Sequence, residues 1–162
     1  MFYGRLTHHE EIVSQRPKGL TALGAFFIFG AAMSFTAGVG LLFPNGPLEP
    51  MWRLNPRARE GFGRMGLWAV VLMFAVCIAC SFAAAGLWRG AVWGHRLAIG
   101  VLVLNLLGDA INALSGLEPR AALGVPIAGA LVAYLVSDSV RAFFAAHEPG
   151  VTRERRRTTG WS

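Results

Sequence analysis

Long apolar runs alternate with short polar segments along the whole chain. Four such runs cover about residues 19–43, 65–88, 93–117 and 121–137. About 20 apolar residues in a helix cross the hydrocarbon core of a bilayer, so each run has close to the length of a membrane span. The first run is too long and unbroken for the apolar region of a signal peptide. The pattern therefore predicts an all-α integral membrane protein, a four-helix bundle with one amphipathic extramembrane loop.

The polar segments divide the chain into three parts. We expect a polar N-terminal tail, a four-span transmembrane domain and a basic C-terminal tail, at residues 1–18, 19–145 and 146–162. The length of the chain allows one compact unit rather than two.

The longest connection, residues 44–64, has a helix signal of its own. Three prolines between Pro44 and Pro50 prevent a continuous helix there. Asn55 followed by Pro56 is typical of an N-cap and first helical residue, which predicts a short helix over Pro56–Arg64. Met51, Trp52 and Leu54 make the connection amphipathic, so we expect it to lie along the membrane surface or over the bundle.

The third apolar run carries three polar side chains, which we call the polar stripe: Asn105, Asp109 and Asn112. Their spacing of i, i+4 and i+7 places them on one face of a helix, over roughly 10 Å along its axis. In hydrocarbon such a face is costly, so it must meet protein, water or a ligand. We expect Asp109 to be hydrogen-bonded to another member of the stripe, or salt-bridged to Arg64 or Arg120.

Small residues at four-residue spacing predict two faces where helices pack closely. The first run has Gly30, Ser34 and Gly38, and the second run has a longer series, Ala69, Cys77, Ser81 and Ala85. Small residues allow helix backbones to approach each other in a membrane. We favour packing within this chain over a homodimer contact.

Composition supports a membrane protein and argues against a nucleic-acid partner. Of the 162 residues, 54% are hydrophobic and only 15% are charged, whereas soluble domains carry about a quarter charged residues. The net charge of +6 comes from basic residues outside the apolar runs. No nucleic-acid-binding spacing is present. Anionic lipid headgroups are the predicted partners of the C-terminal cluster Arg153, Arg155, Arg156 and Arg157.

Two groups of residues have the chemistry of a redox or metal site but the wrong context. Cys77 and Cys80 have thiol-redox spacing, but within a span little would stabilise a thiolate, so packing is the favoured role. The His8–Glu11 cluster has ligand side chains, but adjacent residues converge poorly on one ion. We therefore predict no metal, no cofactor and no catalytic residue.

The distribution of basic residues predicts that both termini face the cytoplasm. The two tails and the connection near residue 90 carry ten basic residues: Arg5, Arg16, Lys18, Arg89, Arg96, Arg141, Arg153, Arg155, Arg156 and Arg157. The other two connections carry five: Arg53, Arg57, Arg59, Arg64 and Arg120. Cytoplasmic loops are enriched in Lys and Arg. If the four C-terminal arginines are left out, six basic residues remain on the predicted cytoplasmic side against five on the other side.

Several short motifs are spread along the chain: Trp52-Arg-Leu-Asn-Pro56, Gly86-Leu-Trp88 with Trp93-Gly94, Asn105 with Gly108-Asp109, and Pro126-Ile127 followed by Tyr134-Leu135 and Arg141. Together they resemble a pattern in small four-span bacterial inner-membrane proteins, a group that is uncharacterised. The resemblance covers most of the chain and implies a bacterial inner-membrane location. It carries over no catalytic residue.

Three classes of function fit these features. The favoured one is a structural or accessory subunit of a larger membrane complex, such as a respiratory or photosynthetic one, in which the polar stripe joins helices. The first alternative is a small oligomeric transporter or ligand-binding protein that uses Asp109, although no internal repeat marks a transporter. The second is a membrane enzyme acting on lipid or quinone, for which no second acid, histidine or nucleophile lies near Asp109 within a run.

Overall fold

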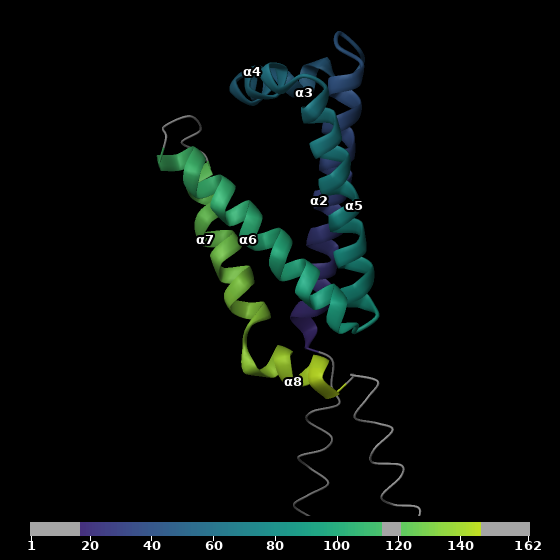
Figure 1. Cartoon of the computed structure of the whole chain (residues 1–162), viewed down its shortest axis with the longest axis vertical. Helices are drawn as coiled ribbons and strands as arrows, with labels where there is room; N and C mark the ends of the chain where they lie inside the picture. The colour runs from purple at the N-terminus through teal and green to yellow at the C-terminus, as the bar shows by residue number, and fades with distance from the viewer. Residues whose placement is uncertain (1–16, 115–120, 147–162) are drawn as a thin grey trace, which may run out of the picture.

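The computed structural model describes residues 17–114 and 121–146, and every regular element within them is an α-helix. The helices are α2 (Lys18–Leu42), α3 (Glu49–Arg53), α4 (Pro56–Met65), α5 (Leu67–Trp88), α6 (Val92–Leu114), α7 (Ala121–Leu135) and α8 (Asp138–Ala146). Helices α2 and α5 form one antiparallel pair, and α6 and α7 form another (Figure 1). The His8–Glu11 cluster, Arg120 and the C-terminal arginines lie outside the described residues.

Within the described ranges, three helices are long and apolar enough to cross a membrane, which indicates a membrane protein. They are Gly19–Leu42, Leu67–Trp88 and Val92–Leu114, with 24, 22 and 23 residues. The predicted fourth span is not confirmed, because α7 has only 15 residues. It reaches a span's length only together with α8, across a 48° bend. The prediction counted apolar residues up to 137, whereas the helix ends at Leu135 and the hydroxyl of Ser137 donates to the carbonyl of Tyr134.

The α2–α5 pair is packed through small residues, as predicted for the first run. A Cβ on Gly38 would lie 3.3 Å from Phe74, and one on Gly30 would lie 3.7 Å from the Cys80 sulfur. The glycines therefore bring the two backbones close within one chain. Cys80 is buried there as a packing residue.

The packed face of α5 differs from the predicted series at Ser81. Ser81 is exposed, and its hydroxyl donates to the carbonyl of Cys77 at 2.8 Å. The buried positions toward the end of the helix are instead Cys80, Ala83, Ala84, Gly86 and Leu87. A series spaced by four residues rotates about 40° per step on a 3.6-residue helix, so it leaves the contact face within a few steps.

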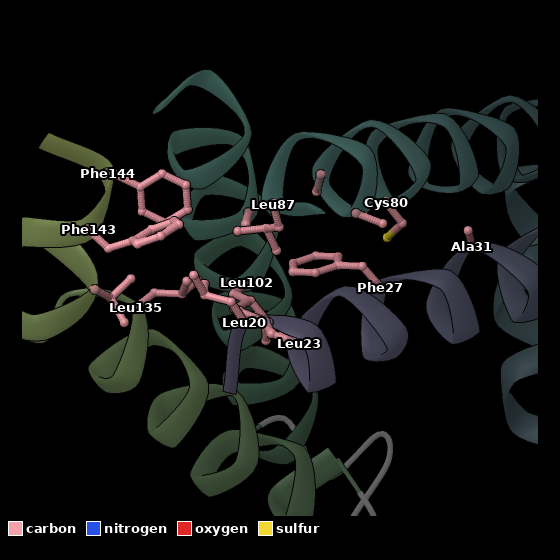
Figure 2. Packing of buried hydrophobic residues seen from close by; sticks show 14 residues of the cluster. Leu20, Leu23, Phe27, Ala31, Cys80, Leu87, Leu102, Leu135, Phe143 and Phe144 are labelled. Carbon is pink, nitrogen blue, oxygen red and sulfur yellow. The ribbon is translucent and has the colours of Figure 1, made fainter. Parts of the chain in front are cut away.

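The hydrophobic core lies at the end of the molecule where α8 is found (Figure 1). Figure 2 shows side chains from five helices meeting there, including Phe27 of α2, Leu87 of α5, Leu102 of α6, Leu135 of α7 and Phe144 of α8. Helices α5 and α6 enter this core at one tight crossing. A Cβ on Gly86 would overlap the backbone of Gly94, so neither position has room for a side chain.

His95 of α6 contacts both α7 and α8, at the bend between these two helices. Its Nε2 lies 2.8 Å from the carbonyl oxygen of Leu135, the last residue of α7. Its ring also stacks on Phe144 of α8, with centroids 4.6 Å apart. Carbonyls at a helix end lack partners within the helix, so His95 supplies one that α7 cannot.

Helices α3 and α4, residues 49–65, lie across the opposite end of α2 and α5, and we call them the α3–α4 platform (Figure 1). The predicted helix start is confirmed, because the Asn55 side chain accepts a hydrogen bond from the Ala58 N–H at 3.1 Å. Helix α3 was not predicted; it begins at Glu49 and tolerates Pro50 in its first turn. Trp52 is buried and meets Phe62 of α4 edge-to-face, which holds the two helices together.

Candidate intramembrane polar site

The polar stripe occupies the C-terminal half of α6, away from the core. Helix α6 packs on α5 near its start and then runs obliquely away from α2 and α5, with α7 beside it (Figure 1). Asn105 and Asn112 are exposed, and Asp109 is half-buried. The stripe therefore lies at the open end of the molecule, where the α6–α7 pair is separated from the α2–α5 pair (Figure 1).

Asp109 has one hydrogen-bond partner within the stripe. The Nδ2 of Asn105 donates to Oδ2 of Asp109 at 3.4 Å. The predicted hydrogen bond is thus present, although its length exceeds the usual 2.7–3.2 Å and makes it weak. Asn105 has its carboxamide oxygen left for another partner.

Asp109 also packs directly against α7. A Cβ on Gly124 would overlap Oδ2 of Asp109, so the carboxylate occupies the space that a side chain at Gly124 would fill. Gly124 therefore lets α7 approach the acid closely. The small residues Gly124, Ala128 and Val132 share one face of α7, but this pattern did not identify Asp109 as the contact.

The predicted arginine partners do not complete the site. Arg64 is exposed, and across residues 17–114 and 121–146 no salt bridge joins it to Asp109. In Figure 1, α4 projects from the start of α5 toward the side on which α6 and α7 lie. Arg120 lies outside the described part of the chain, so the other expected salt bridge stays a prediction.

The face of α6 around the stripe is open on both flanks. Leu104, Leu107 and Ile111 are 72%, 54% and 62% exposed. Only 11% of the apolar window of α6 is buried, against 33% for α5. An exposed apolar surface is ordinary for a helix in lipid, but exposed carboxamides are not.

The chemistry available at the stripe is hydrogen bonding rather than catalysis. Among the described residues, no group of three His, Cys, Asp or Glu side chains could hold a metal ion. Cys77 and Cys80 lie on α5 and carry no bond to each other. The stripe offers one carboxylate and two carboxamides, a set suited to accepting and donating hydrogen bonds across a helix interface.

Sequence reasoning missed two functional contacts, those of His95 with Leu135 and of Asp109 with Gly124. Both join residues far apart in the chain, and neither has a local spacing that would signal it. Comparison of the chain with protein-family models, with curated proteins and with solved structures finds no match.

Proposed function

We propose that this protein is a structural or accessory subunit of a larger membrane complex, and that α6 is the helix that joins it to its partner. The observation that supports this proposal is the exposure of Asn105 and Asn112 on a helix long and apolar enough to span a membrane. A carboxamide facing hydrocarbon forgoes its hydrogen bonds. A partner helix with polar side chains would restore them.

The size of the expected interaction suits assembly rather than tight ligand binding. Interhelical hydrogen bonds in membranes contribute about 0.6 to 2 kcal/mol each. Two asparagines would therefore set the register of the contact, while the exposed apolar side chains around them supply the packing area. A respiratory or photosynthetic complex in a bacterial inner membrane, with both termini of this chain in the cytoplasm, is the setting we propose.

The test compares two double variants of α6 in the native membrane. Asn105→Leu with Asn112→Leu removes the polar groups and keeps their size. Val71→Ala with Ile78→Ala on α5 is the matched control, since these exposed residues have the same seven-residue spacing on a helix to which the proposal assigns no partner contact. After mild-detergent extraction we expect the wild-type chain in a particle well above 17.4 kDa, and the asparagine variant near monomer size.

Two results would overturn the subunit proposal. One is a wild-type chain that is monodisperse at monomer size in every mild detergent. The other is equal loss of the large particle in the asparagine variant and in the control, because the polar groups would then have no part of their own.

A transport or ligand site at Asp109 is the second candidate. One specific observation favours it: the carboxylate is half-buried between α6 and α7, and among the described residues its only side-chain hydrogen bond is the weak one from Asn105. An ionisable group within a span is a candidate proton or cation acceptor. In vesicles holding the purified chain, Asp109→Asn should abolish proton or cation flux while leaving particle size unchanged; absence of flux in the wild type removes this candidate.

A further inference from the structure

The α3–α4 platform directly precedes the start of α5, a helix long and apolar enough to span a membrane. Only Gly66 separates Met65, the last residue of α4, from Leu67, the first residue of α5. Gly66 has a φ of 57°, which turns the chain sharply between the two helices. Helix α4 consequently lies across the end of the span instead of extending it (Figure 1). Because α5 is long and apolar enough to span a membrane, a bilayer around α5 would have its interface at the end where α4 lies.

The platform is a rigid unit rather than a loose connection. Trp52 is only 6% exposed, and its ring lies against α2, where a Cβ on Gly40 would be 2.8 Å from the Trp52 Nε1. A salt bridge between Glu49 and Arg59 joins α3 to α4. The N-cap by Asn55 fixes the start of α4. These contacts hold the remaining arginines in set positions.

Three arginines of the platform are exposed and have no acidic partner. Arg53, Arg57 and Arg64 form no salt bridge within the described ranges, whereas Arg59 is neutralised by Glu49. With Glu60 included, four arginines and two glutamates leave residues 49–65 with a net charge of +2. Arg57 and Arg64 are seven residues apart, so they share one edge of α4 at roughly 10 Å along its axis.

Large apolar side chains lie next to these arginines. Leu54, Leu67 and Trp68 are 77%, 73% and 74% exposed. Basic residues beside exposed Leu and Trp are the composition of a helix in the plane of the membrane interface, with its apolar side chains in the acyl boundary. Trp itself is favoured at this depth.

We propose that the α3–α4 platform binds the phosphate groups of anionic phospholipids through Arg53, Arg57 and Arg64. Guanidinium groups form paired hydrogen bonds with phosphate oxygens, and a lipid phosphate is the anion present at the depth of α4. Leu54, Leu67 and Trp68 enter the acyl boundary beneath. The bound lipids hold one end of the α2–α5 pair at a fixed depth in the bilayer. This inference is independent of the role proposed for α6.

Amide hydrogen exchange in lipid nanodiscs provides a local test. The full-length chain is placed in nanodiscs of pure phosphatidylcholine and in nanodiscs with one-third phosphatidylglycerol, and exchange is followed in peptides from residues 49–66. We expect slower exchange in the anionic discs, because surface basic residues favour an anionic surface by roughly fivefold each at low salt. Added salt to 0.5 M should remove most of the difference.

Two triple variants separate the platform from the rest of the chain. Arg53→Gln, Arg57→Gln and Arg64→Gln together should abolish the lipid-dependent protection of residues 49–66. Arg89→Gln, Arg96→Gln and Arg141→Gln remove the same charge from exposed positions at the opposite end and should leave it unchanged. Equal exchange in both lipid compositions for the wild type overturns the proposal without any variant. So does equal loss in both triple variants, which would indicate a general charge effect.

Discussion

At the end of the molecule that contains α8, five helices meet in a continuous apolar core, whereas at the other end α6 and α7 are separated from α2 and α5 (Figure 1). The packed end has glycines in contact at the α5–α6 crossing and a histidine that bonds to the end of α7. The open end has exposed carboxamides and a half-buried carboxylate. At the packed end the polar side chain therefore has a partner within the chain, whereas at the open end the polar side chains are exposed or half-buried.

The difference shows at which end the polar side chains have their hydrogen-bond partners within this chain. At the packed end the His95 ring nitrogen has the Leu135 carbonyl as its partner, so the polar group is satisfied within the chain. At the open end Asn112 forms no side-chain hydrogen bond within residues 17–114 and 121–146. Polar groups without partners in a membrane mark a place where something else binds. Under the proposed function, the core at the packed end stabilises the chain itself, and the open end is where a partner would bind.

The largest expected effect is at the packed end. Phe27 is 1% exposed in the core, whereas Phe29 on the same helix is 64% exposed. Phe27→Ala should lower the free energy of unfolding by about 3 kcal/mol, because it leaves a cavity among five helices. Phe29→Ala should change it by less than about 0.5 kcal/mol. Reversible unfolding in mixed micelles measures both; similar values for the two variants would remove the distinction between the ends.

A substitution at the α5–α6 glycine crossing should lower the free energy of unfolding by a smaller amount. In Gly86→Ala the new methyl group would overlap the Gly94 backbone, so α5 and α6 must separate, at about 1–3 kcal/mol. Gly100→Ala on α6 is the matched control, since a Cβ there meets nothing within 4 Å. The same unfolding measurement applies, and a destabilised control would show that helix glycines matter here for a reason other than contact.

The contact of Asp109 with Gly124 can be tested as a pair. Gly124→Ala should destabilise the chain by about 1–2 kcal/mol, because the methyl group displaces the carboxylate. In an Asp109→Ala background the same substitution should cost little, since the space is then empty. A double-mutant cycle gives the coupling directly. Additive effects would mean that the two residues do not touch.

The smallest expected effect is that of the His95 bond. His95→Phe keeps a ring to stack on Phe144 but loses the hydrogen bond to the Leu135 carbonyl, which should cost about 1 kcal/mol. His95→Ala loses both contacts and should cost more. If the Phe variant is as stable as the wild type, stacking alone holds α8 in place.

Much of the fold could be predicted because apolar runs and local caps are local signals. Helices α2 and α5 begin and end within two residues of the predicted spans, and Asn55 caps α4 as its position before Pro56 indicates. The short α7 could not be predicted, because the run remains apolar through Val136 while the break is made by the Ser137 hydroxyl and the start of α8. The length of an apolar run shows how far hydrophobic residues continue, but it does not show where a helix breaks.

The site was predicted in part. The polar stripe and its Asn105–Asp109 bond follow from helical spacing. Three other features depend on how the helices pair in space: the exposure of Asn112, the contact of Asp109 with Gly124, and the bond of His95 to Leu135. The two contacts join residues 15 and 40 positions apart, and a single sequence has no spacing that reveals them.

The short length of α7 has a consequence for the surrounding bilayer. At 1.5 Å per residue its 15 residues cover about 22 Å, less than the ~30 Å of a typical hydrocarbon core. A crossing of the bilayer by α7 alone would therefore be mismatched, and it would favour local thinning of the lipid around α7, at a cost of fractions of a kcal/mol per ångström. Thinner lipid would bring headgroups and water toward Asp109. A short helix would thus give its neighbour's carboxylate a route to the aqueous phase.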